Sequence, residues 1–299
     1  MNINPVPPIS RLLDALARMD RGTCARLADL AGDLWHRFDR RHVKIVHSNL
    51  RRAFGDELND ADRKKLCRAV FRNLARVILE FPFLRVLDRR VDEFMCFEGY
   101  EHVVQARAKG KGVLIMASHF GNWEMMSLGC SYRCTPFSVV VRPLDNRVLD
   151  ELVNEIRSAG GNRIVPKKGS IREVLRILRR GELVALLVDQ NVDWYDGVFV
   201  PFFRDIACTN KALAVLALRT GAPVIPIHNF RRPDGKYQVV IEPELGLIRT
   251  GDTTSDIEEN TALFNRVIEG YVRRYPEQWF WVHQRWKTRP WQPWPKGRE

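Results

Sequence analysis

The chain has 299 residues, of which 45% are hydrophobic, so it can bury a core as one large α/β domain or two small ones, and it is neither disordered nor fibrous. Its formal net charge of +12 calls for an acidic partner, which could be nucleic acid, an anionic membrane surface or a carrier protein. The six cysteines form no C-x-x-C pair, which argues against a zinc or redox motif and favours a reduced, cytosolic setting. We expect Cys130 and Cys134 to be small buried hydrophobes rather than metal ligands.

The N-terminal part of the chain is amphipathic. Leucines at roughly helical spacing, with arginines between them, predict two or three helices over residues 10–54. These helices either pack on their own domain or lie with one face in a membrane interface. No apolar run reaches the length of a membrane span, and the start lacks the order of a signal peptide, so we expect a protein that stays on the cytoplasmic side. We divide the chain into a membrane-facing helical extension, residues 1–58, and a main domain, residues 59–299.

The rest of the chain alternates between helices and short apolar runs. A helix over about residues 59–87, broken near Pro82, is followed by strands and helices in turn, and a last long helix over about residues 257–275 leads into a Trp-rich tail. Near-continuous Val/Ile/Leu strands between helices predict an α/β fold: a mainly parallel central sheet with helices on both faces, preceded by the helical extension. The expected strands lie near residues 112–118, 137–143, 182–190, 222–230 and 236–244.

A polar pair follows the first of these strands, in "GVLIMASHFGNWE". His119 and Glu124 could not touch within one continuous helix or strand, but they could meet across a turn if a strand ends near Ser118 and a helix begins near Asn122. Gly121 supplies backbone freedom for that turn, and Asn122 can cap the helix. Ligand sites of open α/β sheets lie at the carboxyl ends of strands, where this pair would lie.

An imidazole next to a carboxylate suits general base catalysis. The carboxylate would accept the proton of one ring nitrogen and leave the other nitrogen free as the base. With no Ser or Cys nucleophile beside it, the base would deprotonate a substrate hydroxyl directly. Spacing alone leaves open that His119 is structural and Glu124 a chance neighbour. A zinc protease would need H-E-x-x-H, which the chain lacks.

From these residues onward, the sequence resembles the lysophospholipid acyltransferase superfamily and, more narrowly, the lipid A biosynthesis acyltransferases, the lauroyl and myristoyl transferases. The resemblance covers roughly residues 40–290, and the "W-x-H-x-R-W-K-T-R-P" ending is its most specific part. The matching stretches, in order, are "RRHVKIVHSNL", "HFGNWE", "VVRPLDN", "IVPKKG", "LLVDQN", "GVFVPFF", "GAPVIPI" and "PEQWFWVHQRWKTRP".

The resemblance implies transfer of a fatty acyl group from a thioester, on acyl carrier protein or coenzyme A, to a hydroxyl of a lipid A precursor in lipopolysaccharide biosynthesis, with no other cofactor and no metal. His119 would be the general base and Glu124 its orienting partner. Arg142 and Arg163 fall in the part of the pattern associated with anionic headgroups, and a guanidinium bonds phosphate bidentately. Asp189 and Gln190 stand where related enzymes carry a Glu-Gly motif. Both residues could bind substrate, and Asp189 could instead be a structural cap.

The resemblance implies a mechanism in which the substrate hydroxyl attacks the thioester carbonyl directly, so no acyl-enzyme forms. A backbone N–H or a basic side chain would stabilise the negative charge that develops on the carbonyl oxygen. The positive charge of the chain would attract three anionic partners, namely acyl carrier protein, the anionic membrane surface and the phosphorylated glycolipid acceptor. Many members begin with a transmembrane helix, here reduced to the amphipathic "ISRLLDALARMD", so we expect a monotopic or peripheral enzyme on the cytoplasmic face of the cell inner membrane. In the tail, Trp291 and Trp294 are expected at headgroup depth, whereas either packing or interfacial contact fits Trp279, Trp281 and Trp286.

Other functions remain as alternatives. The acceptor could be a lysophospholipid, a mannosylated inositol lipid or an ornithine lipid. A nucleic-acid-binding protein would explain the charge, but no reading module or aromatic platform is evident, so no nucleic-acid partner is expected. A catalytically inactive membrane-associated homologue is disfavoured because His119 and Glu124 are both present.

Overall fold

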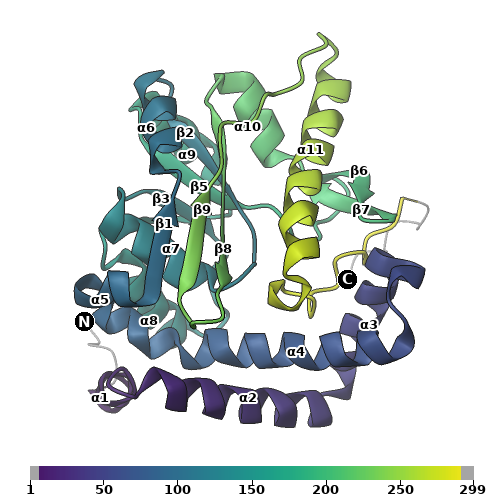
Figure 1. Cartoon of the computed structure of the whole chain (residues 1–299). Helices are drawn as coiled ribbons and strands as arrows, with labels where there is room; N and C mark the ends of the chain where they lie inside the picture. The colour runs from purple at the N-terminus through teal and green to yellow at the C-terminus, as the bar shows by residue number, and fades with distance from the viewer. Residues whose placement is uncertain (1–6, 291–299) are drawn as a thin grey trace.

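A mainly parallel sheet forms the centre of the molecule. The structure, a computed structural model, describes residues 7–290 (Figure 1). Within these residues the sheet has seven strands in the order β1-β9-β8-β2-β5-β3-β4, and every neighbouring pair is parallel except β8 with β9. The strands in that order are Met95–Glu98, Tyr237–Ile241, Val224–Arg231, Val113–Ala117, Leu183–Leu187, Ser138–Val141 and Arg163–Pro166.

The register of β2 against β5 determines which polar residues meet beyond the sheet. Ala117 of β2 lies opposite Leu187 of β5. Two residues further along each parallel strand come His119 and Asp189, so both side chains are brought to the same carboxyl edge of the sheet.

Helices cover both faces, as the apolar strands predict. One face packs on helices from the middle of the chain, and the other packs on later helices and on α4. On β2, Val113, Ile115 and Ala117 point to the first core, and Leu114 and Met116 to the second. The first group is α5 (Leu87–Phe94), α6 (Tyr100–Ala108), α7 (Trp123–Arg133) and α8 (Arg147–Ser158); the second is α4 (Asp60–Leu79), α9 (Ser170–Arg179), α10 (Ala212–Thr220) and α11 (Thr253–Arg274).

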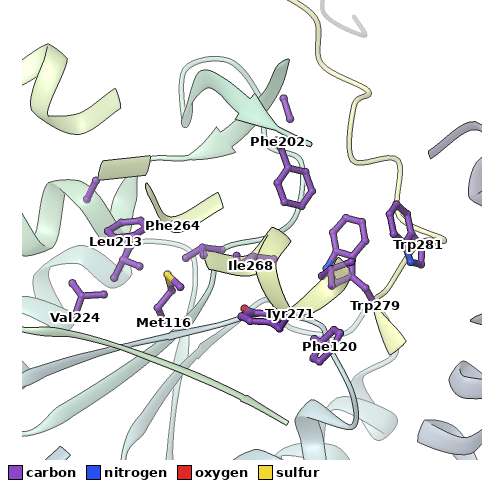
Figure 2. Packing of buried hydrophobic residues seen from close by; sticks show 14 of the residues in the cluster. Met116, Phe120, Phe202, Leu213, Val224, Phe264, Ile268, Tyr271, Trp279 and Trp281 are labelled. Atoms are coloured by element: carbon purple, nitrogen blue, oxygen red, sulfur yellow. The ribbon is translucent and has the colours of Figure 1, made fainter. Parts of the chain in front are cut away.

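The second core reaches from the sheet to the C-terminal segment. Figure 2 shows Ile268 and Tyr271 of α11 between Met116 of β2 on one side and Trp279 on the other, with Phe264 of the same helix near Leu213. Three tryptophans of the tail, Trp279, Trp281 and Trp286, are buried, so packing is the correct alternative for them. Trp291 and Trp294 lie outside the described residues.

The first three helices are α1 (Pro7–Leu16), α2 (Arg21–Phe38) and α3 (Arg40–Phe54). Figure 1 shows α2 running alongside α4 as an outer layer. The two helices approach closely at Gly32, where a Cβ atom would lie 2.5 Å from the Cα of Arg72. α3 adds Val46 and Leu50 to the second core. Within residues 7–290, none of the helices is both long and apolar enough to cross a membrane.

A two-stranded antiparallel hairpin, β6 (Gly197–Phe202) with β7 (Asp205–Asn210), stands apart from the main sheet and was not expected from the alternating pattern. It packs on α11, and Asn265 of that helix donates to the carbonyl of Pro201. Phe202 of β6 contacts Trp279 and Trp286, so the hairpin helps to bury the tail. The edge strands β1 and β4 were also unexpected.

Candidate active site

A large cavity is lined by four of the six residues that the sequence singled out. Its volume is about 1650 Å³, and His119, Glu124, Arg142 and Gln190 are among the residues that line it. Apolar side chains from the sheet, from α7 and from the segment before β3 form its depth, including Ile115, Ala117, Met126, Phe137, Val139, Ala185 and Ile227. A cavity of this size exceeds the range of most small-molecule sites and suits a ligand with a long apolar part.

His119 is paired with Asp189. Its Nδ1 lies 2.9 Å from Oδ1 of Asp189, and its peptide N–H donates to Oδ2 of the same carboxylate at 2.9 Å. The indole N–H of Trp279 donates to Oδ2 as well, at 2.8 Å. The side chain of Asp189 is 1% exposed, whereas that of His119 is 20% exposed. The carboxylate is therefore buried behind the imidazole, and the imidazole faces the cavity.

This arrangement keeps Asp189 ionised and orients the ring of His119. Burial by itself would raise the pKa of Asp189, but the charge and hydrogen bonds of His119, with the indole of Trp279, lower it below its ordinary value. An ionised Asp189 accepts a proton-bearing Nδ1, which leaves Nε2 of His119 with a free lone pair. The amide nitrogen of Gln190 lies 3.4 Å from that Nε2. Such an imidazole can act as a general base toward a bound hydroxyl.

The structure differs from the expected pairing of His119 with Glu124. Both carboxylate oxygens of Glu124 accept from the guanidinium of Arg157, with Nε of Arg157 at 2.8 Å from Oε2. Within the part of the chain that the structure describes, no hydrogen bond joins Glu124 to His119. Glu124 lies in the first turn of α7 and Arg157 in the last turn of α8, so this ion pair joins two helices at the cavity wall.

The two predicted anion-binding arginines have different positions. Arg142 lines the cavity, with 80% of its side chain exposed and Asp145 at 3.5 Å. Arg163 is paired with Glu173 at 3.5 Å and is not among the cavity-lining residues that the structure describes. Seven cationic and three acidic side chains of the described residues line the cavity; the cations are Arg142, Arg157, Lys167, Lys168, Arg172, Lys211 and Arg219.

Comparison with known proteins identifies the family of the chain. A family model described as bacterial lipid A biosynthesis acyltransferase matches residues 11–288. The chain belongs to this family.

Individual relatives match over most of their length. The acyltransferase is 31% identical over 268 residues to the lipid A biosynthesis lauroyltransferase of Escherichia coli (strain K12). The matched region covers 89% of this chain and 85% of the relative. It is 28% identical over 257 residues to the palmitoleoyltransferase of the same organism, covering 85% and 81%. It is also 27% identical over 246 residues to a phosphatidylinositol mannoside acyltransferase of Mycolicibacterium smegmatis, covering 81% and 78%.

The turn that carries His119 is held on several sides in the acyltransferase. Gly121 has φ of 62°, and a Cβ there would lie 2.2 Å from the carbonyl oxygen of Asn229. The peptide N–H of Gly121 donates to the carbonyl of Gln278 at 2.9 Å. Asn122 caps α7 as predicted, since its Oδ1 accepts from the peptide N–H of Met125.

A buried polar network lies behind the turn. Glu80, at the end of α4, accepts from the side-chain amide of Asn122 at 2.9 Å and from the hydroxyl of Tyr237 at 2.7 Å. Arg231 donates to both oxygens of Glu80. Every partner of this carboxylate is therefore a donor, which keeps a partly buried charge satisfied and immobilises the cap of α7.

Sequence reasoning missed three residues of the site. Trp279 and Arg157 each hold one of the two carboxylates, and His283 lines the cavity beside His119. Trp279 and His283 lie in the motif-rich ending, which identified the family but not the partners. Arg157 lies on the polar face of an amphipathic helix, where an arginine is ordinary.

Proposed function

We propose that this acyltransferase moves a fatty acyl chain from the thioester of acyl carrier protein to a hydroxyl of a lipid A precursor in lipopolysaccharide biosynthesis. The observation that carries the proposal is the His119–Asp189 pair, positioned at the wall of a cavity with an apolar depth and cationic lining. The apolar depth suits the acyl chain, the cations suit phosphate, and the imidazole suits the hydroxyl that must lose a proton.

The reaction needs one base and no covalent enzyme intermediate. Nε2 of His119 takes the hydroxyl proton as the hydroxyl oxygen forms a bond to the thioester carbonyl carbon. The carbonyl electron pair moves onto its oxygen, and the imidazolium is stabilised by Asp189, 2.9 Å from Nδ1. When the carbonyl re-forms, the C–S bond breaks and the thiolate leaves, taking the proton from His119. General base catalysis of this kind contributes about 10²–10⁴ in rate.

Charge supports acyl carrier protein as the donor. Carrier proteins of this kind are acidic, whereas this chain carries a net charge of +12. Cationic side chains such as Lys167, Lys168 and Arg172 line the cavity, where they could meet both an acidic carrier and the phosphates of a lipid A precursor. Coenzyme A, which is also anionic, is the alternative donor.

A second acceptor class remains a candidate because one relative is named a phosphatidylinositol mannoside acyltransferase. A mannosylated inositol lipid also offers a hydroxyl and a phosphate, so the same base and the same cations would serve. The identities of 31% and 28% to two lipid A acyltransferases favour the lipid A precursor.

The outward face of α2 supports work at an anionic membrane surface, on the cytoplasmic side of the inner membrane. Leu27, Leu30, Leu34 and Phe38 form an exposed apolar stripe along this helix, each between 47% and 75% exposed. The two acids of α2 face α4 instead: Asp29 pairs with Arg76, and Asp33 with Arg68 and Arg72. Arg26 and Arg37 of α2 are also exposed, so the exposed surface of the helix combines apolar side chains with arginines, as interfacial helices do.

Lipid mass spectrometry tests the proposal. Cells that express the gene should contain a lipid A species heavier by one acyl chain than cells that lack it. Cells that carry His119→Ala should resemble cells without the gene. An added chain on a mannosylated inositol lipid would support the second acceptor, and an added chain that persists undiminished with His119→Ala would overturn the mechanism.

A further inference from the structure

His283 lines the same cavity as His119, and the mechanism so far gives it no task. It belongs to the segment that follows α11, and this segment is hydrogen-bonded to the turn that carries His119. The peptide N–H of Phe280 donates to the carbonyl of His119 at 3.0 Å, and the peptide N–H of His283 donates to the carbonyl of Phe280 at 3.3 Å. The position of His283 is therefore tied to that of His119 through two backbone hydrogen bonds.

The tautomer of His283 is determined by its neighbour Asn191. The peptide N–H of Asn191 donates to Nε2 of His283 at 2.8 Å. A peptide N–H can only donate, so Nε2 carries no proton, and the neutral ring bears its proton on Nδ1. Burial lowers the pKa of His283 to about 4, outweighing the charge of Asp189, which acts in the opposite direction, and Arg285 lowers it further. At neutral pH the ring is uncharged.

The proton-bearing nitrogen belongs to a ring that lines the cavity, and it has no hydrogen-bond partner among the described residues. Among residues 11–290, no side chain hydrogen-bonds Nδ1 of His283, and this atom is not one of the buried polar atoms that lack a partner. This atom is therefore accessible, and the residue that carries it lines the cavity. The consecutive residues Gln190 and Asn191 contact the two rings, since Gln190 lies 3.4 Å from Nε2 of His119. Two residues that line the cavity thus carry complementary groups, an accepting nitrogen on His119 and a donating nitrogen on His283.

We propose that the Nδ1–H group of His283 donates a hydrogen bond to the thioester carbonyl oxygen and stabilises the oxyanion that forms there. This role rests on the acyl transfer proposed above. As the acceptor oxygen bonds to the carbonyl carbon and His119 takes its proton, negative charge collects on the carbonyl oxygen, and the hydrogen bond from His283 strengthens. The oxygen loses this charge when the C–S bond breaks. A neutral imidazole acts as such a donor in triosephosphate isomerase.

Two substitutions separate the donor from the shape of the ring. His283→Phe keeps a flat ring without a donor, and we expect kcat to fall by about 10²–10³ while KM for the acyl donor changes by less than about threefold. His283→Asn carries an amide N–H as many bonds from Cα as Nδ1, so it should recover at least about tenfold of that loss. A kcat for His283→Phe close to wild type, or equal losses in the two variants, would overturn the role.

Nitrogen-15 NMR of imidazole-labelled protein tests the same idea without any substrate. At pH 7 the His283 signals, assigned by their loss in His283→Phe, should show a protonated Nδ1 and an unprotonated Nε2. An Nε2–H tautomer or an imidazolium would refute the inference even if the enzyme transfers acyl chains. If instead the wild type acylates neither proposed acceptor, the proposed function fails while the tautomer result stands by itself.

Discussion

Replacing Asp189 by Asn tests which carboxylate serves the catalytic histidine. The substitution keeps shape and keeps a carbonyl that can accept from Trp279, but it removes the charge 2.9 Å from Nδ1 of His119. At an effective dielectric constant of ~20, two unit charges at this separation attract by about 6 kcal/mol. Because the attraction exists only once His119 carries the proton, the loss falls on the transition state and corresponds to roughly 10⁴ in kcat.

Glu124→Gln is the matched control, because it also neutralises a carboxylate at the cavity wall. It leaves Arg157 without an ionised partner, and we expect the free energy of unfolding to fall by roughly 1–3 kcal/mol. Its effect on kcat should be at least about tenfold smaller than that of Asp189→Asn, since Glu124 is hydrogen-bonded to Arg157 and not to the imidazole.

The assay is the initial rate of acyl transfer from an acyl thioester to a lipid A precursor at saturating substrate, with denaturant unfolding measured on each variant. Circular dichroism confirms that both variants are folded before their rates are compared. A loss of kcat in Glu124→Gln equal to or larger than that in Asp189→Asn would refute the pairing of His119 with Asp189.

Three further predictions concern the membrane, the acceptor and pH. Leu34→Asp should weaken binding to anionic vesicles at low salt by about tenfold or more, as sedimentation would measure, whereas Val104→Asp on α6 should not; equal binding by both variants would contradict the α2 stripe. Replacing Lys167 and Lys168 by Ala should raise KM for a phosphorylated acceptor about tenfold with little change in kcat, and an unchanged KM would exclude them from phosphate binding. Burial lowers the pKa of His228 from 6.5 to about 3, so the unfolded chain takes up a proton at this residue before the folded protein does. The free energy of unfolding should therefore fall by about 1.4 kcal/mol per pH unit as the pH drops from 6.5 toward 3. His228→Phe should flatten this slope, and an equally steep slope in the variant would show that His228 is not its cause.

The fold was accessible from the sequence because its strands are distinctive. Runs such as Val113–Ala117 and Leu183–Leu187 are continuously apolar, which a strand covered on both faces requires. The hairpin β6–β7 was not predicted because neither strand is a continuous apolar run. Buried and exposed positions are mixed along both strands, β6 contains a proline, and β7 contains polar residues.

The histidine was predictable, but its partner was not. A buried strand ending in His119 with Gly121 and Asn122 behind it predicts a catalytic turn from local chemistry alone. The choice between Glu124 and Asp189 depends on strand order: β5 pairs with β2 across 70 residues of chain, and nothing within either segment encodes that neighbourhood. Glu124 was the nearer carboxylate in sequence, and its competing partner Arg157 lies on a different helix.

The central claim, that His119 removes a proton from a hydroxyl that then accepts an acyl chain from a thioester, is tested most directly with purified protein. The protein is incubated with acyl carrier protein loaded with a fatty acid and with a lipid A precursor, and both products are followed by mass spectrometry. The wild type should yield a precursor heavier by one acyl chain for each free carrier thiol, and His119→Ala should yield neither above background. Thiol release without acylated precursor, or product formation by His119→Ala at the wild-type rate, would contradict it.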